Sequence, residues 1–262
     1  MKRSALSTCV AAFFFASVSI SQAQVTTYFG DANGSPRDLT VANASRNLFL
    51  SQLGINGTDN FDSYPVFPSP PPPTYTLAGV GTTYTSNGTL IGFDGGFGGN
   101  LSTSPTQFLL ANAVSPSGPF GPTNDFIFSN KIQAFGIYFI QAGDGSNSNS
   151  FTVTLKDGPA GTPRTVNIDG VPVGNGSGPA LVFSGRQFDN AFFFGITDNV
   201  FFDRVTITNT SSQDGVIFDD LTIGFTTAVP EPATYALIGG ILALGYGRNR
   251  YLKRIAAKNK GY

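Results

Sequence analysis

The chain contains no histidine and no tryptophan, and its one cysteine, Cys9, lies near the start. Zinc sites are built mainly from thiolate and imidazole ligands, so the composition argues against a zinc centre. The serine and cysteine hydrolases that use histidine as the base are excluded for the same reason. Without a second cysteine no disulfide can form within the chain, so the folded part depends on core packing.

Glutamate is almost absent as well, since Glu231 is the only one. Residues 24–228 contain fifteen Asp, two Lys and five Arg, which gives a net charge of −8. This acidic body disfavours nucleic acid and anionic membrane surfaces as partners. Acid–base chemistry would have to rely on aspartate alone, as calcium ligands or as an Asp–Asp glycosidase pair. We expect a protein that is not an enzyme and that binds no nucleic acid.

The amino terminus has the order of a secretory signal. Lys2 and Arg3 precede an apolar run over residues 10–20. This run is too short to span about 30 Å of hydrocarbon, and the small residues of Ser21-Gln22-Ala23 fit a peptidase site. We expect signal peptidase to remove residues 1–23, so that an exported mature chain begins at Gln24.

A second apolar segment, residues 233–247, lies near the carboxy terminus and is followed by a basic cluster. Its length corresponds to roughly 22 Å of helix. The preceding residues are Val229, Pro230, Glu231 and Pro232, and prolines so spaced predict an extended element before the helix. Basic residues stay on the cytoplasmic side of a membrane, so we expect the body outside and a single transmembrane helix here. The expected anchor residues are Ala233, Leu237, Gly240, Leu244, Gly247, Arg248 and Arg250.

This order of a Pro-Glu-Pro motif, a short apolar segment and a basic tail resembles the PEP-CTERM sorting signal over residues 229–262. Proteins with this signal are substrates of exosortases, membrane enzymes of bacteria that make exopolysaccharide. The resemblance implies that an exosortase recognises the Pro-Glu-Pro motif and that the anchor is removed on transfer. It also implies an inner-membrane-anchored precursor, followed by a cell-surface or extracellular form associated with exopolysaccharide or biofilm.

Between the two signals, β-rich runs alternate with turn residues at roughly 8–12-residue spacing, which is typical of an all-β sandwich or barrel. Asp-Gly pairs such as Asp157-Gly158 indicate tight turns and antiparallel pairing. We expect an all-β fold, an antiparallel jelly-roll-like β-sandwich over residues 74–228. The expected strands are Tyr75–Ala78, Thr89–Phe93, Gln107–Leu110, Asp125–Ser129, Ile132–Ile140, Phe151–Lys156, Arg164–Ile168, Ala180–Phe183, Ala191–Thr197, Phe202–Asn209 and Val216–Phe225.

Residues 24–73 are expected to form one N-terminal amphipathic helix and a proline-rich connector. Ser35 is a good N-cap, Pro36 suits the first helical position and Gly54 is a good stop. Apolar residues recur at helical spacing between them. The connector is the stretch from Pro65 to Pro73, which is expected to be extended.

The strand patterns indicate where this helix packs. In the strand starting at Ala191, Phe192 and Phe194 face one way and Phe193 the other, so both faces are apolar. Ala134 and Gly136 leave one face of the neighbouring strand shallow. We expect the helix to cover this outer face; the alternative is an aromatic patch exposed to a partner.

Two acidic positions lie at the ends of the expected sandwich. Asp62 precedes its first strand and Asp219 lies in its last strand. This layout is similar to jelly-roll modules of the carbohydrate-binding kind, in which carboxylates at such positions share a structural calcium ion. The similarity implies that Asp62 and Asp219 ligate one calcium ion. Alternatively, Asp219 or Asp220 points into solvent, since neighbours in a strand face opposite ways.

Three functions remain open. The leading one is a non-enzymatic envelope or extracellular-matrix protein that is sorted through its carboxy terminus. Thr-x-Thr pairs at 83/85, 152/154 and 206/208 place two hydroxyls on one strand face each, so a carbohydrate- or ice-binding module delivered by the same route is the second. An Asp-dependent glycosidase is the third.

Overall fold

The computed structural model describes residues 25–31, 38–66, 74–77, 79–86, 90–93, 102–104, 106–111, 123–142, 150–168, 191–210 and 216–227, together with Tyr246. The chain divides into two units, Met1–Thr226 and Thr227–Tyr262. Only Thr227 and Tyr246 of the second unit are among the described residues, so the fold described is that of the first unit.

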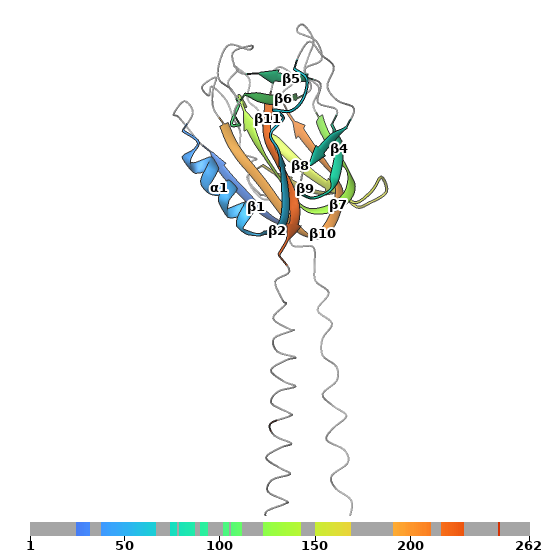
Figure 1. Ribbon diagram of the computed structural model, residues 1–262. Helices are drawn as coiled ribbons and strands as arrows, with labels where there is room; N and C mark the ends of the chain where they lie inside the picture. Colours follow the sequence, from blue (N-terminus) through green and yellow to red (C-terminus); the bar gives the residue numbers. More distant parts are fainter. Residues whose placement is uncertain are drawn as a thin grey trace, which may run out of the picture. The chain divides into compact units, whose positions relative to one another are not determined.

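Eleven strands and one helix make up the described fold, and two long antiparallel strands form its centre (Figure 1). These are β7 (Thr123–Ile140) and β10 (Ala191–Asn209), whose mutual register shifts twice in the middle, between Thr197 and Arg204. The other elements are β1 (Val25–Asp31), α1 (Thr40–Ser51), β2 (Leu53–Asp59), β3 (Tyr75–Leu77), β4 (Thr82–Ser86), β5 (Leu90–Phe93), β6 (Gln107–Ala111), β8 (Phe151–Lys156), β9 (Arg164–Asn167) and β11 (Val216–Thr226).

The irregular middle of β7 and β10 separates two layers. On one side of it β10 pairs with β1 and β7 with β11, while on the other side β10 pairs with β8 and β7 with β4. Phe126 and Phe135 lie in different halves of β7, yet their ring centroids are 5.5 Å apart, so the two halves face each other across the core. The described part is therefore mostly antiparallel β-sheet in two layers with a helix, and the coarse part of the predicted fold is confirmed.

Alternation along β10 determines which side chains enter the core. Phe192 and Phe194 are buried in the main cluster between the layers, whereas Phe193 packs in a second cluster with Ala42 and Phe49 of α1. The prediction that this strand is apolar on both faces is confirmed, because one face meets the opposite layer and the other meets the helix.

The helix lies on the outer face of the first layer, as predicted, where glycines make room for it. Phe49 is fully buried above Gly136 and Gly195. A Cβ atom on Gly136 would lie 2.7 Å from Cε1 of Phe49, and one on Gly195 would lie 2.8 Å from its Cδ2. Any larger residue at either glycine would therefore push the helix away from the sheet.

The helix limits differ from those expected. Leu39 is not helical, and Asp38 Oδ1 accepts a hydrogen bond from the Thr40 N–H at 3.0 Å, so the helix begins at Thr40. The predicted cap, Ser35-Pro36, lies outside the described residues, as does most of the proline-rich connector. Gly54 does not end the helix but lies in β2, because the chain turns at Gln52 directly into a strand that pairs with β11.

The sequence did not predict β1, β2 or β4, and it divided β7 and β10 into two strands each. Asn130 and Asn199 lie in the gaps between these pairs of predicted strands. In the structure these residues lie where the paired strands shift register and stay extended. The predicted strand at 180–183 lies outside the described residues.

Candidate functional site

Asp219 is fully buried in β11, where hydrogen-bond donors surround it. Its Oδ2 accepts from the Thr103 N–H at 2.6 Å, the Thr103 hydroxyl at 2.9 Å and the Ser104 N–H at 2.9 Å. Its Oδ1 accepts from the Ser104 hydroxyl at 3.1 Å and the Asp220 N–H at 2.7 Å. A buried carboxylate needs such donors to offset the loss of water, and here it orders the segment that leads into β6.

Asp62 holds the next part of the same segment. Its Oδ1 accepts from the Thr106 N–H and hydroxyl, both at 3.1 Å, and from the Gln107 N–H at 2.9 Å. Its Oδ2 accepts from Asn60 Nδ2 at 2.8 Å. The structure thus brings the two predicted residues, Asp62 and Asp219, onto one short segment, although they are far apart in sequence.

The predicted calcium ion remains an untested prediction. Calcium takes six to eight oxygen ligands. No group of three or more acidic or other metal-binding side chains that could hold a metal occurs in the described part of the chain. Three backbone N–H groups point at Asp219, and their positive hydrogens occupy the positions that a cation would need. A calcium ion at Asp219 would have to displace these donors.

Asp220 follows Asp219 in β11, has a positive φ angle and places a second carboxylate close to that of Asp219. Its φ is 49°, a left-handed conformation that costs energy in a residue other than glycine, and β11 shifts register against β7 at this point. Burial, together with the Asp220 carboxylate, raises the pKa of Asp219 to about 7, while the hydrogen bonds from Ser104 and Thr103 act in the opposite direction. Burial raises the pKa of Asp220 too, which Arg46 opposes.

We expect the free energy of unfolding to fall as the pH rises from about 4 to about 7. In this window the folded chain keeps a proton on Asp219, whose pKa is about 7 in the fold against an ordinary 3.8, whereas the unfolded chain has released it. One such group contributes at most about 1.4 kcal/mol per pH unit. Urea unfolding at a series of pH values measures this slope.

Asp219→Asn should flatten that slope. Asp38→Asn is the control, because Asp38 is exposed and its hydrogen bonds with Thr40 lower its pKa. The control should keep the slope of the parent chain. An unchanged slope in Asp219→Asn would contradict the assignment.

A second buried carboxylate, Asp59 at the end of β2, was not predicted. Its Oδ2 accepts from the hydroxyls of Tyr64 at 2.7 Å and Tyr84 at 3.0 Å, and its Oδ1 accepts from the Phe61 N–H at 3.0 Å. The rings of Tyr75 and Tyr84 stack at 4.9 Å beside it. Burial raises the pKa of Asp59. Tyr84 lies 25 residues from Asp59 in the chain, so no local sequence pattern pairs this acid with that tyrosine.

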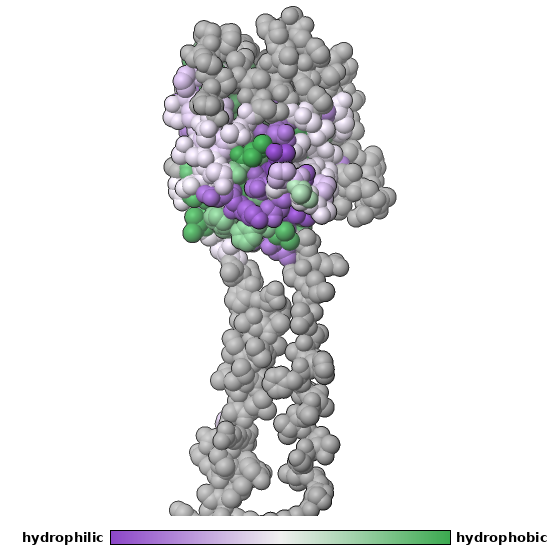
Figure 2. Space-filling view, turned by 90° about the vertical axis from the view of Figure 1, so that its right-hand side faces the viewer, coloured by the Kyte–Doolittle hydropathy of each residue, from purple (hydrophilic) through white to green (hydrophobic). Residues whose placement is uncertain are grey.

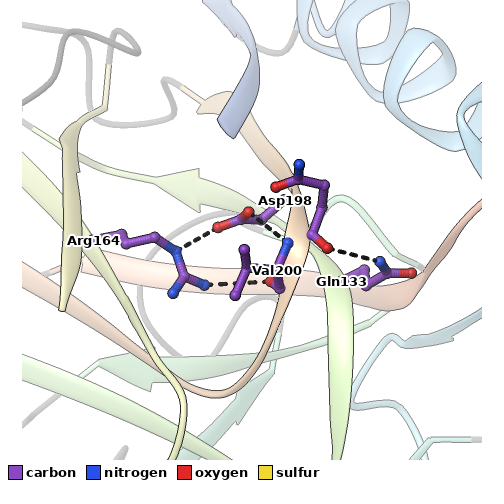
Figure 3. A network of polar contacts seen from close by, with 5 residues as sticks. Gln133, Arg164, Asp198 and Val200 are labelled. Carbon is purple, nitrogen blue, oxygen red and sulfur yellow. Dashed lines mark hydrogen bonds and ion pairs between the residues drawn. The ribbon is translucent and has the colours of Figure 1, made fainter. Parts of the chain in front are cut away.

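A buried ion pair, also not predicted, holds the middle of β10 (Figure 3). Arg164 Nε lies 2.6 Å from Asp198 Oδ2, and the Asp198 side chain is fully buried. The other oxygen of Asp198 accepts from the Val200 N–H at 2.8 Å, and Arg164 Nη2 donates to the Val200 carbonyl at 3.3 Å. Gln133 Nε2 donates to the Asn199 carbonyl at 3.5 Å from the β7 side. Together these contacts fix the backbone of residues 198–200.

The remaining predicted site residues lie outside the described residues. These are the sorting residues Val229, Pro230, Glu231 and Pro232, and the anchor residues Ala233, Leu237, Gly240, Leu244, Gly247, Arg248 and Arg250. Among the described residues, no helix combines the length and the apolar character needed to cross a membrane.

The chain matches no family model and no curated protein. Among solved structures it is similar to the CBM22-1 xylan-binding domain of Xyn10C from Paenibacillus barcinonensis, at 14% sequence identity and a TM-score of 0.33. The match covers 56% of this chain and 87% of that domain. A likeness this low carries no argument about fold or ligand.

Proposed function

We propose that this chain is an exported, non-enzymatic protein of the cell envelope or extracellular matrix, sorted through its carboxy terminus. The observation that carries this proposal is the order of Pro230-Glu231-Pro232, an apolar segment and a basic cluster in residues 229–262. Signal peptidase removes the leader, the apolar segment holds the precursor in the inner membrane as a transmembrane helix, and an exosortase recognises the motif. The protein then reaches the surface or the matrix, where exopolysaccharide is its expected partner.

The described body supports a structural role. The carboxylates of Asp59, Asp62 and Asp219 all accept hydrogen bonds from N–H or hydroxyl groups of the same chain. Such carboxylates order loops and strand ends instead of facing a substrate. The strand pairs of the described residues all fall between Val25 and Thr226, within the predicted mature segment. We propose that the two layers form a jelly-roll-like sandwich.

Intact-mass analysis of the protein from native membranes and from the culture medium tests this proposal. We expect a released form that begins at Gln24 and ends near residues 230–232. Replacing Glu231 by Gln should retain the precursor in the membrane, whereas Thr227→Ala, just upstream of the motif, should be processed like the parent. A chain that still carries Tyr262 in every fraction would contradict processing by an exosortase.

A second candidate, binding of carbohydrate or ice, is favoured by a threonine face on the second layer. Thr206 of β10 pairs with Thr154 of β8, which pairs with Thr165 of β9. Intervening residues such as Val153 and Val205 point into the core, so these threonines share the outer face. The hydroxyls of Thr154 and Thr165 lie 2.7 Å apart, whereas the Thr206 hydroxyl donates to Asp125 Oδ1. Retention on insoluble polysaccharide or thermal hysteresis would favour this candidate over the first.

A further inference from the structure

Four apolar side chains at one end of the sheet are here called the end patch: Ile55, Val200, Phe201 and Phe225. Ile55 and Phe225 are partners across β2 and β11, and the rings of Phe225 and Phe201 are 6.4 Å apart. Ile55 is 59% exposed, Phe201 44% and Val200 37%. Figure 2 shows apolar surface at the lower end of the first unit, next to a polar band. Contiguous apolar surface of this kind marks a contact site.

The protein holds part of this patch in place. The ion pair between Arg164 and Asp198, with its hydrogen bonds to Val200, fixes the backbone that presents Val200 and Phe201 (Figure 3). The acid at this bend is fully buried and paired. The exposed side chains of Val200 and Phe201 are therefore fixed in position, next to the exposed Asn199.

Both ends of the first unit's described sheet lie beside the end patch. Val25, the first residue of β1, pairs with Asp198, two residues before Val200. Thr226, the last residue of β11, follows Phe225 directly, and its hydroxyl donates to Gln133 Oε1 at 3.4 Å. The chain therefore leaves β11 at the patch. From Thr226 to Ala233, where the predicted anchor begins, seven residues can span at most about 25 Å.

We propose that the end patch rests on the outer surface of the bilayer that holds the carboxy-terminal anchor. This inference depends on the proposed anchored precursor, because the anchor then brings this end of the body within reach of the lipid. Tethering raises the effective concentration of bilayer at the patch, so a patch too small to bind vesicles alone can stay bound. The body carries a net negative charge, so an anionic bilayer would repel it and neutral lipid is favoured.

A second copy of the chain is the competing occupant of this surface. The position of the patch favours lipid, because both ends of the described sheet and the short link to the anchor lie at the same end. Contact between copies would not require that placement. It would depend on protein concentration, whereas contact with the bilayer would depend on lipid.

The absence of tryptophan allows a direct test. Phe201→Trp places a single indole in the patch, and Phe93→Trp is the matched control, since Phe93 in β5 is 40% exposed and β5 lies at the opposite end of the unit (Figure 1). Each full-length variant is reconstituted into neutral phosphatidylcholine vesicles with or without bromine on the acyl chains. Flotation of the vesicles reports anchoring, and quenching of the indole reports contact with lipid. Circular dichroism confirms that both variants are folded.

We expect both variants to float, with emission blue-shifted and quenched by brominated lipid for Phe201→Trp but not for Phe93→Trp. If both float and neither is quenched, the patch proposal fails and the anchor stands. A chain that does not float overturns the anchored precursor, and the patch proposal with it. A blue shift at position 201 that grows with protein concentration in the absence of lipid assigns the patch to a second copy.

Discussion

Replacing Arg164 by Met should lower the free energy of unfolding by about 3–5 kcal/mol, because it leaves the buried Asp198 carboxylate without its partner. Arg164 is only 19% exposed in its side chain, and Asp198 is fully buried. Lys131→Met removes a second ion pair of the described residues, the one between Lys131 and Asp157. The side chains of these two residues are 56% and 38% exposed. Solvent already screens this second pair, so its loss should cost less than about 1 kcal/mol.

Urea unfolding of the two single variants measures this difference. The double variant Arg164→Met, Asp198→Leu should recover part of the loss, because it also removes the unpaired charge. It should not recover all of it, since the Val200 N–H then lacks the acceptor that Asp198 Oδ1 provides. Equal losses for Arg164→Met and Lys131→Met would mean that the Arg164–Asp198 pair contributes no more than a surface pair.

The packing of the helix could be predicted from the sequence, because local patterns carry it. Alternation of Phe192, Phe193 and Phe194 gave a strand with two apolar faces, and small residues on the next strand gave a shallow surface. β2 could not be predicted in this way, since four of its seven residues are Gly, Asn or Asp and its pairing with β11 supplies what their propensity lacks. β1 differs, because its first five residues, Val25 to Phe29, do favour a strand.

The hydrogen-bond and ion-pair partners of the buried acids could not be predicted from local patterns either. The two carboxylates expected to meet, Asp62 and Asp219, do contact one segment, and their partners include four backbone N–H groups, those of Thr103, Ser104, Thr106 and Gln107. Every residue except proline has a backbone N–H group, so the pattern of side chains in the sequence does not identify which N–H groups will bind a carboxylate. Arg164 and Asp198 lie in different strands, and only the fold places one beside the other.

Phe49→Ala should cost about 3–5 kcal/mol of unfolding free energy, because it empties a fully buried site between the helix and the sheet. Leu48→Ala, at the neighbouring helical residue that is 62% exposed, should stay within about 0.5 kcal/mol of the parent. Urea unfolding compares the two. Similar costs at both positions would mean that the helix does not pack on the sheet through Phe49.

Gly136, which lies against the ring of Phe49, gives a sharper test of this packing. The cost of substituting Gly136 should depend on whether the ring is present. Gly136→Ala in the parent chain should cost about 1–3 kcal/mol, because the new methyl group would lie 2.7 Å from Phe49 Cε1. In the Phe49→Ala background that ring is absent, and Phe193, which would also lie 2.8 Å away, has room to move. The same substitution should then cost much less or stabilise the chain, because the methyl group fills part of the cavity. A double-mutant cycle measures this coupling, and additive costs would show that the glycine is not there to make room for Phe49.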